Sequence, residues 1–320
     1  NDVLTCAFKI GVAFIDLLNK QERIAVVDLQ YPNKNMDYWQ KVLTYCVDGN
    51  LQAVLDEYVF MLLNDIDDVW KLTETICRLL TMRTSALKID DARSFCQRET
   101  DDNDHRYSLR SHYAAAFGVK TTSSQGSEHR ATNVREAFNS PFRPFVLATT
   151  SIGQEGLDFH WYCRKIMHWN LPNSPIDFEQ REGRINRYRG KIIRQRIANK
   201  YKYALDGLKM PWKELFRLAE QDKYFAKFPC AIVPKWHFAA DDNDVAIERV
   251  VPIYQFSMDI QRYIAMKRVL GIYRLTFGQP RQEELIEALD CELTSEEIDK
   301  LLIELCPLKK KQKVEFKRFE

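Results

Sequence analysis

The sequence predicts an α/β fold in which a parallel sheet with helices on both faces is flanked by two mainly helical regions. Residues 145–148 form a short apolar run directly after Pro144, which is typical of a parallel strand buried on both faces. Residues 165–170 have the composition of the next strand. Ser174 followed by Pro175 then predicts a helix, because serine caps helices and proline suits the first helical position.

An N-terminal helical region, residues 1–82, is expected to precede the sheet. Its apolar residues recur at three- and four-residue spacing, which predicts helices over 3–18, 36–47, 51–63 and 69–82. Helix breaks are expected at Asp48-Gly49-Asn50 and at Asn64-Asp65. The region is either a packed helical core or a helical insertion that contacts a partner or a duplex.

The sheet region is expected to span residues 83–205, with a strand over 85–89 and a helix over 109–117. After Gly190, lysines and arginines alternate with apolar residues, which predicts an amphipathic helix with a positive face. That face either follows a nucleic-acid backbone or is simply solvated. Residues 206–320 form a third, mainly helical domain, with helices expected over 212–220, 257–275, 282–289 and 295–305.

The loop after the first strand carries groups suited to a nucleotide. Gly153 and Gly156 let backbone N–H groups approach phosphate closely. Asp158 is an acceptor for a ribose hydroxyl or an arginine. In open α/β sheets, ligands lie outside the carboxyl ends of the strands, which is where this loop would be.

The helix that begins at Ser174 carries the second set of groups. Gln180, Arg184 and Arg187 are spaced i, i+4 and i+7, so a continuous helix would place them on one face. An arginine that stabilises charge on a transferring γ-phosphoryl group is worth roughly 10³–10⁵ in rate. Taken alone, either segment is equally well a solvated face or a helix-entry turn; the two together indicate a nucleotide site.

Together these segments resemble motifs V and VI of superfamily-two helicases and translocases. The resemblance extends to Phe138-Asn139-Ser140-Pro141 and His168-Trp169-Asn170-Leu171-Pro172. Together these stretches are similar to the second motor lobe of Swi/Snf-like bacterial ATPases. A weaker resemblance covers residues 273–283. The resemblance to motifs V and VI implies a RecA-like lobe, a parallel sheet with helices on both faces, within residues 83–205.

The resemblance also implies roles for single residues. Arg184 and Arg187 would be arginine fingers, and Gln180 would sense the nucleotide phosphates. One departure is that Tyr188-Arg189 follows the last finger where a glycine is expected. The remaining contacts implied are nucleotide binding by Glu155, Gly156 and Asp158, and nucleic-acid binding by Thr149, Thr150 and Ser151.

The other half of a motor is missing from the sequence. No Gly-Lys-Ser/Thr occurs, since Gly190-Lys191 is followed by Ile192, and a phosphate loop requires it. The expectation is a C-terminal portion of a longer motor whose first RecA-like lobe holds the phosphate loop and Mg²⁺; that residue 1 is not Met agrees with it. Alone, the chain is expected to bind ATP weakly and to hydrolyse none.

Composition sets further bounds. The 320 residues carry a net charge of +2, so any nucleic-acid site must be local. Eight cysteines without CxxC spacing suggest reduced thiols in a cytoplasmic protein and no metal site. No apolar run approaches the ~20 residues of a membrane span.

The leading functional hypothesis is an ATP-dependent helicase or translocase lobe that acts on nucleic acid, with double-stranded DNA as the expected substrate. The alternative, of a different class, is a non-catalytic module derived from a helicase lobe that binds another protein. A helicase lobe that serves a restriction nuclease is a third possibility, although no P-D…E-x-K pattern stands out.

Overall fold

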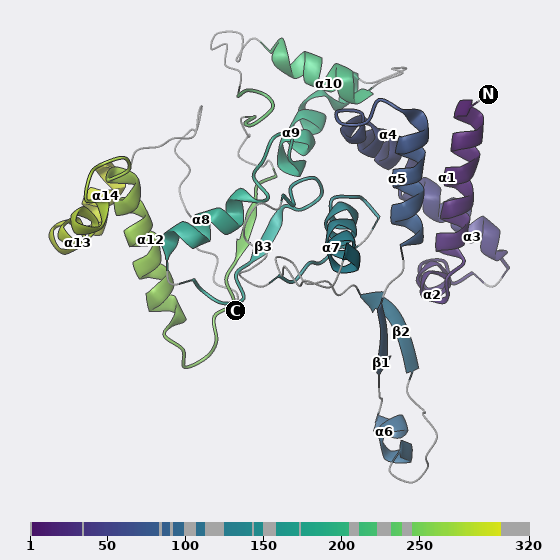
Figure 1. Ribbon diagram of the computed structural model, residues 1–320, viewed down its shortest axis with the longest axis horizontal. Helices are drawn as coiled ribbons and strands as arrows, with labels where there is room; N and C mark the ends of the chain where they lie inside the picture. Colours follow the sequence, from purple (N-terminus) through teal and green to yellow (C-terminus); the bar gives the residue numbers. More distant parts are fainter. Residues whose placement is uncertain are drawn as a thin grey trace. The chain divides into compact units, whose positions relative to one another are not determined.

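The computed structural model describes residues 2–33, 35–82, 85–89, 92–98, 107–112, 125–142, 144–149, 158–172, 174–204, 211–222, 232–238 and 245–301 (Figure 1). The chain divides into two compact units. Unit 1 comprises Asn1–Leu157 and Gly207–Glu214, and unit 2 comprises Asp158–Asp206 and Leu215–Glu320. The domain bounds expected at 82/83 and 205/206 stay a prediction.

Unit 1 begins with five helices, and the four that the apolar spacing predicted are confirmed, with breaks at Gly49-Asn50 and near Asn64. Helix α2 was not anticipated, because its apolar residues 24–27 follow one another directly instead of recurring at three- and four-residue spacing. The helices are α1 (Asp2–Leu18), α2 (Gln21–Gln30), α3 (Tyr38–Asp48), α4 (Leu51–Leu62) and α5 (Val69–Thr81).

Helix α7 (Gln125–Phe138) contacts α5 and leads into residues 139–149. Arg78 of α5 binds Glu136 of α7, with Nη2 2.5 Å from Oε2. After α7 the chain turns at buried Ser140, and the Phe142 ring contacts the rings of Phe14 and Tyr58 at 5.6 and 5.5 Å. Helix α7 and the turn after it therefore pack against the N-terminal helices. The expectation that residues 1–82 are a packed core, or else an insertion that contacts a partner or a duplex, stays a prediction.

Strands β1 (Ser85–Ile89) and β2 (Tyr107–His112) form an antiparallel pair, with α6 (Ala92–Arg98) beyond their far end (Figure 1). The strand expected over 85–89 is confirmed. The helix expected over 109–117 is wrong for residues 109–112, and 113–117 lie outside the described residues. The cross-strand ladder, which pairs Leu87 with Leu109, supplies backbone partners that a local apolar pattern cannot reveal.

Residues 145–148 are not the buried parallel strand that their apolar character predicted. They form no regular structure, and the Phe145 and Val146 side chains are 71% and 85% exposed. A buried strand needs hydrogen-bonded neighbours, and no strand in the described parts of the chain pairs with this segment.

Unit 2 contains a short parallel pair of strands, β3 (Lys165–Met167) and β4 (Glu248–Val250). The pair brings together segments about 80 residues apart, and Nζ of Lys165 lies 2.7 Å from Oε2 of Glu248. The strand expected near residues 165–170 is thus present but short. Across the described residues the structure is helix-rich, with this parallel pair as its α/β component.

The helices of the C-terminal half agree with the predicted ranges as far as residue 301. Residues 302–305 of the last predicted helix lie outside the described residues. The helices are α8 (Pro175–Gly183), α9 (Lys191–Tyr201), α10 (Pro211–Glu220), α12 (Asp259–Leu275), α13 (Gln282–Glu292) and α14 (Ser295–Leu301), with a short 3₁₀ turn over Lys202–Ala204. None of the helices described is long and apolar enough to cross a membrane.

Candidate nucleotide and nucleic-acid site

Helix α8 begins as its sequence predicts. The Ser174 hydroxyl accepts a hydrogen bond from the backbone N–H of Ile176 at 3.2 Å, Pro175 occupies the first turn, and Asp177 is the acid of that turn. Each of these suits the positive end of a helix. The buried Phe178 ring anchors the helix to its neighbours, and Gln180 lies exposed on the helix.

The helix ends at Gly183, so the shared helical face predicted for Gln180, Arg184 and Arg187 is wrong. Glycine is a poor helix former, by about 1 kcal/mol relative to alanine. After it the backbone turns: the N–H groups of Ile185 and Asn186 both donate to the Glu182 carbonyl, at 3.1 and 3.2 Å. Burial of Ile185 holds this turn against the core.

Residues 184–190, here named the arginine loop, are held by backbone hydrogen bonds from elsewhere in unit 2. Phe159 N donates to Arg184 O at 3.1 Å, and Arg189 N donates to Lys235 O at 2.7 Å. The loop closes at Gly190, where a Cβ would lie 3.0 Å from Arg187 O. That distance is tighter than ordinary packing allows, so glycine is favoured there.

Asp158 and Arg187, predicted from the two separate motifs, meet in the structure. Oδ1 of Asp158 lies 3.2 Å from Nε of Arg187, and the side chains are 50% and 44% exposed. Of the two partners expected for Asp158, a ribose hydroxyl or an arginine, the structure contains the arginine. A guanidinium and a carboxylate are thus held side by side at a surface that solvent, and therefore a ligand, can reach.

Arg194 departs from the positive face expected for helix α9, because it is fully buried. Its Nη1 donates to Arg189 O at 2.7 Å and its Nη2 donates to Trp161 O, while its guanidinium lies 5.2 Å from the Tyr162 ring centre. Arg194 therefore ties the arginine loop to the segment that follows Asp158.

Arg196 is also directed inward rather than along a solvated face. Its Nε donates to Val245 O at 2.8 Å, and its Nη1 donates to Phe238 O at 3.0 Å. Two of the α9 cations that the sequence suggested for a nucleic-acid backbone, Arg194 and Arg196, thus donate hydrogen bonds to carbonyl groups of the chain instead.

Glu182, at the end of α8, is the centre of a polar cluster that sequence reasoning missed. It accepts from both sides of the Arg249 guanidinium, with Oε2 2.6 Å from Nη2, and from His168 Nε2 at 3.3 Å. The His168 ring stacks on Phe178 at 4.0 Å. Burial would raise the pKa of Glu182, but the hydrogen bonds from His168 and Arg249 outweigh it and hold that pKa below its usual value.

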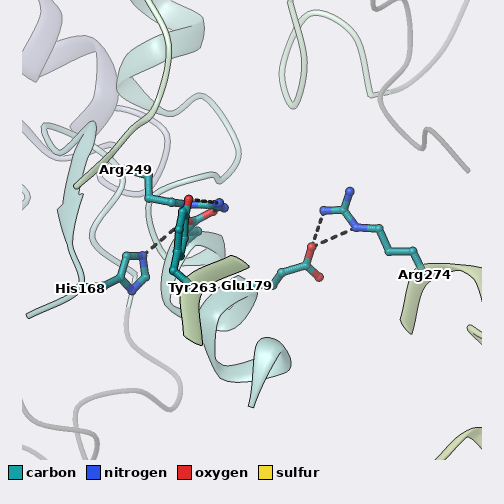
Figure 2. Close-up of polar contacts among 6 residues, drawn as sticks. His168, Glu179, Arg249, Tyr263 and Arg274 are labelled. Carbon is teal, nitrogen blue, oxygen red and sulfur yellow. Dashed lines mark hydrogen bonds and ion pairs between the residues drawn. The ribbon is translucent and has the colours of Figure 1, made fainter. Parts of the chain in front are cut away.

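A second ion pair on α8 joins Glu179 to Arg274 of α12 (Figure 2). Arg274 Nε lies 3.2 Å from Glu179 Oε1, and Nη2 contacts the same oxygen. Arg274 falls within residues 273–283, which the weaker resemblance had marked. No local pattern in the sequence marked Arg249 as a partner of α8, because its position depends on strand pairing across about 80 residues.

His160 lies beside the Asp158–Arg187 pair and is buried. Burial, with a smaller effect of the Arg194 and Arg187 cations, lowers the pKa of His160 to about 4, against the opposing charge of Asp158. The imidazole is therefore neutral at physiological pH. The described residues contain no group of three or more His, Cys, Asp or Glu side chains that could hold a metal ion.

The other predicted site residues are placed only in part. Thr149 is exposed and belongs to unit 1, whereas Asp158, Gln180 and the two arginines belong to unit 2. The rest of the predicted loop contacts lie outside the described residues; these are Thr150, Ser151, Glu155 and Gly156.

Comparison with known families supplies the decisive observation. Residues 72–189 match the family described as the helicase conserved C-terminal domain. The chain therefore contains a helicase C-terminal lobe. Both predicted motifs, helix α8 and nearly the whole arginine loop lie within the matched segment of this lobe, a RecA-like α/β domain, while helices α9 to α14 follow it. The chain matches no curated protein and no solved structure.

Proposed function

We propose that this helicase lobe is the second RecA-like lobe of an ATP-dependent nucleic-acid helicase or translocase of superfamily two. One observation carries the proposal: Arg187 of motif VI lies 3.2 Å from Asp158 of motif V, with both side chains half-exposed. In support of the proposal, Arg187 is an exposed cation on a loop held by backbone hydrogen bonds, so a phosphate could replace the Asp158 carboxylate beside it.

Arg187 and Arg184 act as arginine fingers in this proposal. Guanidinium groups present forked donors that match phosphate oxygens, and they stabilise the charge that develops on the γ-phosphoryl group. Gln180, exposed one turn before the end of α8, contacts or senses the phosphates. Asp158 releases Arg187 when nucleotide arrives, while Gly156 and Glu155 approach the nucleotide from the motif V loop.

A first RecA-like lobe completes the site. The sequence contains no Gly-Lys-Ser/Thr, so the phosphate loop comes from the other lobe, and the chain by itself hydrolyses no ATP. In this proposal Mg²⁺ is likewise held by the first lobe. When bound there, it would neutralise charge on the β- and γ-phosphates.

The polymer bound is nucleic acid, and we propose double-stranded DNA, translocated in the cytoplasm without strand separation as the Swi/Snf-like resemblance suggests. Thr149, Thr150 and Ser151 would contact its backbone. Small hydroxyl groups and backbone N–H groups suit phosphate contacts that carry no sequence information.

The test is DNA-stimulated ATPase activity of the protein that carries both lobes, with Arg184→Ala and Arg187→Ala variants. We expect a loss of about 10³-fold in kcat for at least one of them. Arg181→Ala is the matched control, because this α8 arginine donates to Asn170 O at 3.0 Å and is not assigned a finger role. Normal turnover in both finger variants would overturn the proposal.

The alternative is a non-catalytic interaction module derived from a helicase lobe. The same assay separates the two, because a module of that kind would give no ATPase activity with either the unaltered or the altered arginines. The presence of Gln180, Arg184 and Arg187 together favours the motor.

A further inference from the structure

Helix α8 is held by residues that lie beyond the segment matched by the helicase family. That segment ends at residue 189. Within it His168 and Asn170 contact α8, but two further ion-pair partners of α8 come from β4 and α12, within residues 248–275. Helix α12 packs directly against α8. The helix that carries Gln180 and leads into the arginine loop is therefore held in part by residues outside the matched segment.

The first point of attachment is Glu182, one residue before the end of α8. Arg249 of β4 grips its carboxylate with two donors, and the Arg249 guanidinium also lies 4.4 Å from the Phe178 ring centre. Tyr263 of α12 contributes its hydroxyl 3.5 Å from Arg249 Nη1. A bidentate arginine–carboxylate pair fixes orientation as well as distance.

The second point of attachment is Glu179, three residues earlier. Its carboxylate binds Arg274 in the last turn of α12 (Figure 2). The Glu179 and Arg274 side chains are 34% and 38% exposed, so solvent screens this ion pair more than the Glu182–Arg249 pair. Together with the contacts from His168 and Asn170, these two ion pairs to different elements restrain both the position and the rotation of α8.

We propose that Arg249 and Arg274 are positioning residues for the nucleotide site, and that residues 248–275 form a working part of the helicase lobe. Neither arginine touches the nucleotide. They hold α8, and α8 sets the direction of Gln180 and the start of the arginine loop. The catalytic part of this inference rests on the proposed function; the attachment of α8 does not.

The experiment uses charge exchange at the Glu179–Arg274 pair. Arg274→Glu sets two carboxylates opposite each other, Glu179→Arg sets two guanidiniums opposite each other, and the double variant restores an opposite-charge pair in reversed order. Hydrogen exchange of the α8 amides is measured in the chain, and kcat and KM for ATP are measured in the two-lobed protein. Arg268→Glu is the control, because it breaks an ion pair on the same helix, 2.6 Å to Asp290, that does not involve α8.

We expect each single variant to speed exchange of the α8 amides about fivefold through easier local opening, and to lower kcat more than it changes KM. The double variant should return both quantities to within about twofold of the starting protein. Arg268→Glu should leave α8 exchange unchanged. Arg249→Lys, which keeps the charge but loses the two-pronged grip, should act in the same direction as Arg274→Glu.

Unchanged α8 exchange in Arg274→Glu would overturn the inference. So would faster exchange with a normal kcat, because α8 would then be free to move without consequence. If the two-lobed protein hydrolyses no ATP at all, the proposed function fails, while rescue of α8 exchange by the double variant still supports the attachment.

Discussion

Oδ1 of Asp158 lies 3.2 Å from Nε of Arg187, which joins two motifs that are about 30 residues apart in the sequence. The pair joins Asp158, the last residue of the loop predicted to bind nucleotide, to the arginine loop after α8. Because both side chains are half-exposed, the contact contributes little to stability, typically 0.2–1 kcal/mol for pairs of this kind. In the proposed function, the pair instead holds Arg187 in place before nucleotide binds.

Replacing Asp158 should therefore affect turnover more than folding. We expect Asp158→Ala to change the free energy of unfolding by less than about 1 kcal/mol and to slow ATP turnover of the two-lobed protein by about tenfold, through lost preorganisation. Glu220→Gln is the control, since it breaks a similarly exposed pair with Lys235 at 3.4 Å. A large stability loss with unaltered turnover would contradict this interpretation.

Removing the buried Arg194 guanidinium should, in contrast, lower the stability of the fold. Arg194→Met keeps an unbranched side chain, shorter than arginine, but leaves the Arg189 and Trp161 carbonyls without their donor, at roughly 1–3 kcal/mol for each group left unpaired. We expect a destabilisation of about 2–4 kcal/mol in urea unfolding of the chain. Arg187→Met, at an exposed arginine, should cost less than about 1 kcal/mol; equal losses would contradict the burial argument.

Two glycines within helices should respond in opposite ways to alanine. A Cβ at Gly11 of α1 would meet nothing within 4 Å, so Gly11→Ala should stabilise the chain by about 0.5–1 kcal/mol. A Cβ at Gly271 of α12 would lie 2.8 Å from Cγ2 of the buried Ile298. Overpacking there should exceed the gain in helix propensity and cost about 1 kcal/mol net. Thermal unfolding of both variants checks the signs.

Stability should fall on mild acidification. The folded-state pKa of His160 is lowered from 6.5 to about 4, chiefly by burial, so the unfolded chain takes up the proton first as the pH falls. Its contribution is complete above pH 6.5 and decreases towards pH 4, by roughly 3 kcal/mol in all. Burial, and then Arg196, also lower the pKa of His237, which adds to the same trend.

Urea unfolding between pH 7 and 4.5 measures this dependence. We expect a shallower decline in His160→Gln than in the unaltered chain, and a shallower one again when His237→Gln is added. Below about pH 4.5 the lowered pKa of Glu182 adds a further loss, because protonation removes its ion pair with Arg249. Parallel pH profiles for all three proteins would contradict the assignment to His160 and His237.

Local patterns in the sequence determined most of the helices and the start of α8. Apolar spacing in residues 1–82 and the Ser174-Pro175 cap report hydrogen bonds and packing within a few residues of one another. The motif residues are also a property of the sequence alone. The presence of Asp158, Arg184 and Arg187 indicated a helicase lobe.

Only the tertiary structure decided how these residues are held. Spacing predicted one helical face for Gln180, Arg184 and Arg187, but the helix ends at Gly183, and distant carbonyls and N–H groups shape the arginine loop. Arg194 looked like a surface cation and is buried. Arg249 reaches Glu182 through strand pairing. Such pairings form between segments far apart in the chain, so no local spacing encodes them, and folding selects them by where hydrogen bonds can be satisfied.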